Sequence, residues 1–213
     1  MRPFYVLNQL SIIMSELRNN ITGVILAGGK SSRIGTEKAL LKINGVSLIE
    51  RAISFCKIFF PKLLISTNDI EKFEFTDIEC INDVYPNLGP ISGIHSGLIA
   101  AITDKIFIMS VDIVFDEPRL IETLIEYKTQ KLITIPVIDE IPQYVFGIYS
   151  KNVLSIVEEQ ISKSKMYSPQ KLIKDVDTEL IDFSNVDFFI SNRFININTL
   201  EEFERAKKVF EKT

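Results

Sequence analysis

The sequence predicts an α/β protein in which a mainly parallel sheet carries helices on both of its faces. Short β-branched apolar runs alternate along the chain with longer amphipathic segments. Helix-length segments separate most of the predicted strands, as right-handed crossovers between parallel strands require. No linker rich in Gly, Pro or Ser and no internal repeat breaks the pattern, so residues 21–213 are expected to form one domain.

The period of the apolar residues predicts each element in turn. The first strand is Ile21–Ala27, an apolar run that leads into a glycine pair. The elements expected after it are a helix at Ser47–Phe59, a strand at Lys62–Thr67, a helix at Gly93–Ile102, a strand at Lys105–Val111, a helix at Glu117–Tyr127 and a strand at Leu132–Val137.

The alternation changes after Pro136. Gln143–Tyr149 is predicted to be an inserted or antiparallel strand. The elements expected after it are a helix at Asn152–Ile161, a strand at Glu179–Phe183 and a closing helix at Thr199–Lys208. Thr199 is a good N-cap for that last helix, and Glu201 and Glu202 follow in its first turn, where the helix dipole favours negative charge.

Composition excludes several classes of function. The chain of 213 residues carries 24 Lys and Arg against 28 Asp and Glu, a net charge of -4, so there is no basic surplus for nucleic-acid binding. No run approaches the roughly 18 apolar residues of a membrane span. One histidine and two cysteines, Cys56 and Cys80, provide neither a disulfide framework nor a four-ligand zinc site. We expect a cytoplasmic protein.

The amino terminus is treated separately. Residues 1–20 carry one early charge, but polar residues interrupt their apolar run and no cleavage pattern follows, which argues against a secretory signal. Met14 lies just before the first strand and is a candidate translation start. We therefore expect 1–20 to be an extension outside the domain, with 1–13 dispensable.

A glycine-rich segment follows the first strand. Gly28 and Gly29 are followed by Lys30, Arg33 and Lys38, which places backbone amides and cations at the ligand-binding edge of an open sheet. Neither a P-loop nor the dinucleotide fingerprint fits the glycine spacing. A simple chain-reversing turn is the competing interpretation, but three cations within ten residues favour a polyphosphate site.

A second candidate site residue ends a later strand. Lys105–Val111 leads directly into Asp112, whose carboxylate would point to the same edge as the glycine-rich segment and could hold Mg²⁺. A role in a helix-capping turn is the alternative for this residue. His95, the only histidine, is expected to have a structural or pocket-lining role, because phosphate oxyanions need no side-chain nucleophile.

With the following residues, the glycine-rich segment resembles a known family. Residues 26–45 are similar to the signature loop of sugar-nucleotide-type nucleotidyltransferases and most closely resemble the molybdenum cofactor guanylyltransferases. Residues 83–98, with their Gly-Pro-x-x-Gly pattern, resemble the family's second motif and favour the guanylyl over the cytidylyl branch. Residues 193–203 resemble its carboxy-terminal motif. The resemblance implies a Rossmann-like three-layer α/β/α nucleotidyltransferase fold.

The resemblance also implies the chemistry: Mg²⁺-dependent transfer of GMP from GTP to the phosphate of molybdopterin, with release of pyrophosphate. The residues that match the family's nucleotide-binding positions are Leu26, Ala27, Gly28, Gly29, Lys38, Asn68, Asp83 and Asp112. Of these, the amides of residues 27–29 would hold the triphosphate, and Asn68 and Asp83 would contact guanosine. Lys38, Arg33 and Asp112 match catalytic positions. Asp112 would bind the metal, and Asn198 is a candidate second ligand.

One departure from the family pattern is visible. The family usually has Cys-Asp-x-Pro around its metal-binding aspartate, whereas this chain has Val111-Asp112-Ile113-Val114. Partners implied by the family are GTP, molybdopterin, cofactor-assembly proteins and molybdoenzyme chaperones, with no nucleic acid and no membrane. The alternatives are a cytidylyl- or sugar-phosphate nucleotidyltransferase, and a non-catalytic nucleotide-binding protein on the same scaffold.

Overall fold

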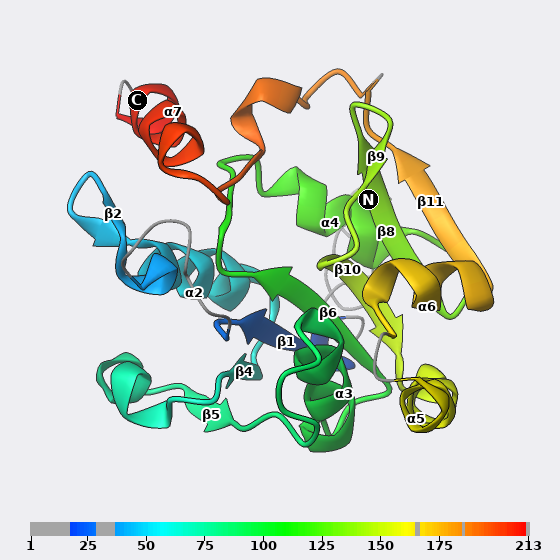
Figure 1. Cartoon of the computed structure of the whole chain (residues 1–213). Coiled ribbons are helices and arrows are strands. Elements are labelled where there is room, and N and C mark those ends of the chain that lie inside the picture. The colour runs from blue at the N-terminus through cyan, green and yellow to red at the C-terminus, as the bar shows by residue number, and fades with distance from the viewer. Residues whose placement is uncertain (1–17, 29–36, 165–166, 185, 212–213) are drawn as a thin grey trace, which may run out of the picture.

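A mixed sheet forms the centre of the molecule (Figure 1). The computed structural model describes residues 18–28, 37–164, 167–184 and 186–211. In this part of the chain the sheet has eight strands in the order β11-β8-β10-β6-β1-β4-β5, with β9 paired to β8. The strands are β1 (Ile21–Leu26), β4 (Leu63–Ser66), β5 (Glu79–Ile81), β6 (Lys105–Ser110), β8 (Ile133–Ile138), β9 (Ile141–Pro142), β10 (Phe146–Ser150) and β11 (Thr178–Asp182).

The sheet is parallel except at two inserted strands. β10 runs antiparallel to both of its neighbours, β6 and β8, and β9 runs antiparallel to β8. The antiparallel option for residues 143–149 is therefore confirmed. β1 pairs in parallel with β4 and β6, from Ile21 opposite Lys105 to Leu26 opposite Ser110. The strands β1, β4 and β6 thus end together at one edge.

Helices cover both faces of the sheet, so the three-layer α/β/α prediction is confirmed. The helices α2 (Leu48–Phe59), α4 (Arg119–Glu126) and α7 (Leu200–Phe210) contribute to one hydrophobic cluster. The helices α3 (Pro90–Ala100), α5 (Leu154–Lys163) and α6 (Pro169–Asp175) belong to a second cluster on the opposite face. β1 contributes alternate side chains to both clusters, because successive residues of a strand face opposite ways.

Two helices begin with a full capping box. Ser47 caps α2 and Thr199 caps α7, in each case with a glutamate three residues later that bonds back to the cap. The predicted N-cap at Thr199 is thus confirmed. α3 begins at Pro90 rather than at the predicted Gly93, because proline suits the first helical turn, where its missing N–H leaves no bond unmade.

Several short elements were not predicted, because segments of two to seven residues show no apolar period. They include β5, β9, α6, the hairpin β2 (Lys42–Ile43) with β3 (Val46–Ser47), the 3-10 helices η1 (Lys38–Leu40), η2 (Ile70–Thr76), η3 (Lys151–Val153) and η4 (Ser191–Arg193), and the strands β7 (Ile113–Val114) and β12 (Ile195–Asn196). The β7–β12 pair matters for the site. Through it, the N–H of Ile197 donates to the carbonyl of Asp112 at 2.9 Å.

The predicted extension at 1–20 falls mostly outside the described residues, and so does Met14. The chain is already packed against the domain at Arg18, which pairs with Glu122 at 3.1 Å and lies 5.2 Å from the ring centre of Phe59. In the described ranges, no helix has both the length and the apolar character needed to span a bilayer.

Candidate functional site

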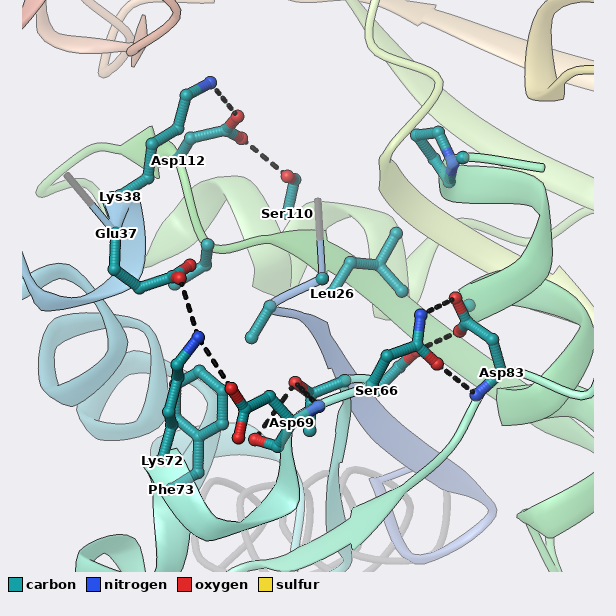
Figure 2. Close-up of a pocket in the computed structure, with 18 of the residues that line it drawn as sticks. Leu26, Glu37, Lys38, Ser66, Asp69, Lys72, Phe73, Asp83, Ser110 and Asp112 are labelled. Atoms are coloured by element: carbon teal, nitrogen blue, oxygen red, sulfur yellow. Dashed lines mark hydrogen bonds and ion pairs between the residues drawn. The ribbon is translucent and has the colours of Figure 1, made fainter. Parts of the chain in front are cut away.

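A pocket of about 650 Å³ opens at the edge where β1, β4 and β6 end (Figure 2). Ligands of open α/β sheets bind at this carboxyl edge, since the loops that leave parallel strands gather there. The described residues that line the pocket are Leu26, Ala27, Gly28, Glu37, Lys38, Ser66, Thr67, Asn68, Asp69, Lys72, Phe73, Asp83, Asn87, Gly89, Pro90, Gly93, Ser110, Val111 and Asp112. Most of the predicted nucleotide-binding residues are therefore neighbours in space.

One end of the pocket holds a lysine and two oxygen side chains. The ammonium Nζ of Lys38 lies 3.2 Å from Oδ2 of Asp112 and 3.2 Å from Oδ1 of Asn198. Ser110 donates its hydroxyl to the other oxygen of Asp112 at 2.5 Å. Lys38 and Asp112 are each about four-fifths buried as side chains. Asp112 and Asn198, which follow Lys38 by 74 and 160 positions in the sequence, thus meet at its ammonium group.

These oxygens fit a divalent cation. Asp112 and Asn198 already converge on one positive charge, the Lys38 ammonium, which marks where a cation is favourable. Among the residues with described positions, no group of three or more His, Cys, Asp and Glu side chains could enclose a metal. Mg²⁺ suits such an open site, because it commonly binds one or two carboxylates and takes its remaining ligands from water and substrate phosphates.

The opposite end of the pocket holds a second carboxylate. Asp83 accepts the Ser66 hydroxyl at 3.1 Å and the Asn68 side-chain N–H at 3.0 Å. The backbone N–H of Asp83 in turn donates to the side-chain oxygen of Asn68 at 3.2 Å. A carboxylate has about four acceptor positions. Asp83 is therefore held by two neutral donors and can still accept further hydrogen bonds from a ligand.

Helix α3 holds the loop that carries Asp83. The hydroxyl of Ser96 accepts the Val84 N–H at 2.9 Å, and Ser92 donates to the carbonyl of Tyr85. His95, 1% exposed, packs its ring 4.8 Å from that of Tyr85 and does not line the pocket. These buried polar groups are all on one helix, so they fix the loop against α3.

The first strand delivers the start of the glycine-rich segment to the pocket. Leu26, Ala27 and Gly28 line it, whereas Gly29 and Arg33 lie outside the described residues. One detail of the prediction is corrected. The N–H of Ala27 donates to the carbonyl of Ser66 at 2.9 Å, because the β1–β4 ladder continues one residue past the strand. This amide is therefore engaged within the sheet and does not point to a phosphate.

The sequence did not predict the cluster of ion pairs that Glu37, Asp69 and Lys72 form at the side of the pocket. The ammonium of Lys72 lies 2.6 Å from Oδ2 of Asp69 and 3.2 Å from Oε2 of Glu37. The hydrogen bond to Asp69 and then that to Glu37 raise the pKa of Lys72. The i,i+3 spacing of Asp69 and Lys72 was a visible signal of an ion pair, but nothing in the sequence linked it to Glu37.

Comparison with known proteins identifies the family to which the chain belongs. Residues 23–179 match the MobA-like NTP transferase domain family. The chain belongs to this family. The members of this family are nucleotidyltransferases. A relative from Natranaerobius thermophilus, described as a probable molybdenum cofactor guanylyltransferase, is 33% identical over 205 residues. The match covers 92% of this chain and 100% of that protein. A Clostridium perfringens relative of the same description is 34% identical over 191 residues, covering 86% and 94%.

Solved structures share the fold of this family member. The molybdopterin-guanine dinucleotide biosynthesis protein A of Archaeoglobus fulgidus superposes with a TM-score of 0.76 at 23% identity, covering 90% of this chain and 100% of that one. The inositol-1-phosphate CTP transferase of T. maritima superposes with a TM-score of 0.66 at 14% identity, covering 91% and 97%. Because these identities are low, the two comparisons establish the shared fold alone.

Proposed function

We propose that this protein is a molybdenum cofactor guanylyltransferase, which transfers GMP from GTP to the phosphate of molybdopterin. The products would be the guanine dinucleotide form of the cofactor and pyrophosphate. Two kinds of observation support this proposal. Relatives at 33% and 34% identity carry the description of such enzymes, and the pocket is lined by the Asp83 carboxylate at one end and the Lys38 ammonium at the other. As in the sequence-based expectation, the enzyme would work in the cytoplasm, alongside cofactor-assembly proteins and molybdoenzyme chaperones.

The observation that carries the proposal is the Asp83 carboxylate at one end of the pocket. Guanine presents two neighbouring kinds of donor, its ring N1–H and its exocyclic amine, along a single edge. An ionised carboxylate is an acceptor only, so it matches that edge and holds it with charge-assisted hydrogen bonds. Asn68 and Ser66 keep the carboxylate in place from the protein side. Asn68, exposed at the rim, would contribute to guanosine binding.

The triphosphate would lie toward the other end. The backbone of Gly28, the ammonium of Lys38 and the guanidinium of Arg33 are the groups proposed to hold its oxygens. Asp112, with Asn198 beside it, would hold Mg²⁺ once the Lys38 ammonium moves from their oxygens to the phosphates. The metal, when bound, would neutralise phosphate charge. Arg33 and Gly29 enter only from the sequence, since both lie outside the described residues.

The reaction needs positioning more than a protein nucleophile. An oxygen of the molybdopterin phosphate, already deprotonated at neutral pH, would attack the α-phosphorus of GTP in line. The bond from the α-phosphorus to the bridging oxygen breaks, and pyrophosphate leaves. Asp83 orients the base, and Lys38 offsets charge on the phosphates, so the rate enhancement comes from alignment and electrostatic stabilisation.

A base-by-acceptor assay tests the proposal. Purified protein with Mg²⁺ and molybdopterin is given GTP, CTP, UTP or ATP, and pyrophosphate release is followed. We expect release with GTP that depends on molybdopterin. Equal or greater release with CTP, or release with a sugar phosphate as acceptor, would assign the other transferase functions. GTP binding with no pyrophosphate under any condition would indicate a non-catalytic nucleotide-binding protein.

A further inference from the structure

Glu37 and Lys38 are adjacent in the chain, yet their side chains reach opposite walls of the pocket (Figure 2). Lys38 pairs with Asp112 and Asn198 beyond the end of β6, at 3.2 Å from each. Glu37 pairs with Lys72 of η2, in the connection between β4 and β5, at 3.2 Å. Residues 37–38 therefore line the pocket and are tied by ion pairs in two directions.

The wall that carries Lys72 is well anchored. Phe73, the next residue, is 1% exposed and belongs to the hydrophobic core. Asp69, the second partner of Lys72, donates its backbone N–H to the hydroxyl of Thr67 at 3.1 Å. The Lys72 ammonium is thus held between a carboxylate of its own wall and the carboxylate of Glu37. Of these groups, only Glu37 lies on the segment that also carries Lys38.

We propose that Lys72 is a positioning residue for nucleotide binding. Its ion pair with Glu37 holds residues 37–38 at the pocket, so that the ammonium of Lys38 is already at the phosphate end when the nucleotide arrives. The inference rests on the proposed function in one respect: the nucleotide's phosphates must bind beside Lys38. The backbone of Lys38 is already held in η1, so the ion pair adds a tie at the Glu37 end of this segment. Without it, that end keeps freedom that binding must remove, and affinity falls.

A direct contact between Lys72 and the phosphates is the competing arrangement, and Glu37 distinguishes the two. If Lys72 acts through Glu37, removing either charge loosens the same tie, and removing both costs no more than removing one. If Lys72 instead binds phosphate itself, Glu37 competes for its ammonium. Removing the glutamate charge would then leave affinity unchanged or increase it.

The experiment measures the dissociation constant of GTP by calorimetry with Mg²⁺ and no acceptor, so that no turnover occurs. The variants are Lys72→Met, Glu37→Gln, the double variant and Lys72→Arg. The matched control is Lys163→Met, which removes an exposed lysine paired with Glu159 on α5, away from the pocket. Thermal melting of each variant verifies that it is folded.

We expect Lys72→Met and Glu37→Gln each to weaken GTP binding about three- to fivefold, the upper part of the range for a partly exposed ion pair. The double variant should be no weaker than either single one. Lys72→Arg should stay within about twofold of wild type, and the control should not change. Unchanged affinity in Lys72→Met overturns the inference. So does unchanged or tighter binding in Glu37→Gln. A wild-type protein that does not bind GTP would instead overturn the proposed function.

Discussion

Gly93 lies where α3 crosses the carboxyl ends of β1 and β4. Replacing it by alanine tests whether the Ser66 hydroxyl holds the Asp83 carboxylate in place for nucleotide binding. An added Cβ would come within 2.6 Å of Cδ2 of Leu26 and 2.7 Å of the hydroxyl oxygen of Ser66. Both neighbours must move. The leucine methyl can shift a little, but the serine hydroxyl escapes mainly by rotating about χ1. That rotation breaks its 3.1 Å hydrogen bond to Asp83.

The expected sizes follow from these contacts. Overpacking a well-packed core costs about 1–3 kcal/mol, and alanine regains about 1 kcal/mol over glycine in a helix. The net loss of stability is about 0–2 kcal/mol, and the melting midpoint falls by at most roughly 8 °C. Losing one hydrogen bond that orients a charged acceptor costs about 1.5 kcal/mol or more. Under the proposed role of Asp83, GTP binding weakens about tenfold.

Gly97→Ala is the matched control, because Gly97 lies one turn further along the same helix. Its added Cβ would meet only apolar groups, two methyls of Val24 at 3.1 Å and Cδ1 of Ile106 at 3.4 Å. It gains the same helix propensity without touching Ser66. The assay is the GTP dissociation constant of each folded variant. If Gly93→Ala binds GTP as wild type does, or both variants weaken equally, the reasoning about Ser66 and Asp83 is refuted.

Three further outcomes are expected. Asp112→Asn should keep the wild-type circular dichroism spectrum but lower the rate of pyrophosphate release about a hundredfold or more; a near-normal rate would disprove the metal assignment. Ser47→Ala removes the capping box of α2 and should cost about 1 kcal/mol, seen as a midpoint lowered by about 2–4 °C in thermal melting. Burial raises the pKa of the Cys56 thiol to about 12 and also raises the pKa of the half-buried Cys80 thiol. Iodoacetamide at pH 8 should therefore leave Cys56 unlabelled, while Cys80 reacts slowly. Labelling of Cys56 in the native protein would contradict its complete burial.

Much of the fold was predictable because its long elements carry a clear apolar period. β1 and β6 are continuous buried runs, and α2 shows one apolar face. The antiparallel strand β10 could be predicted only because the alternation of strands and helices changes after Pro136. Elements such as β5 and η2 could not be predicted, because three to seven residues are too few for a period and their positions depend on tertiary contacts.

The site was predictable where topology alone brings residues together. Lys38 and Asp112 each follow a strand that ends at the same edge, so their meeting follows from a parallel sheet. The engagement of the Ala27 amide was not predicted, since a ladder bond beyond the strand end depends on register. Ser66 was also missed, because a serine in an apolar strand gives no sign that its hydroxyl bonds a carboxylate 17 positions away.

Under the proposed function, the acidic residues of the pocket would determine the orientation in which the nucleotide binds. Among the described lining residues these are Glu37, Asp69, Asp83 and Asp112. Three of them are paired with two lysine ammonium groups, Lys38 and Lys72, so most of the negative charge that a triphosphate would meet beside them is offset. The Asp83 carboxylate accepts hydrogen bonds from Ser66 and Asn68, and both of these donors are neutral, so they do not compensate its negative charge. A triphosphate at that end would be repelled, whereas a base with two adjacent donors is attracted. Adenine places an acceptor nitrogen beside its amine and would set a lone pair against the carboxylate, so under the proposed function the same asymmetry would both orient the nucleotide and select guanine.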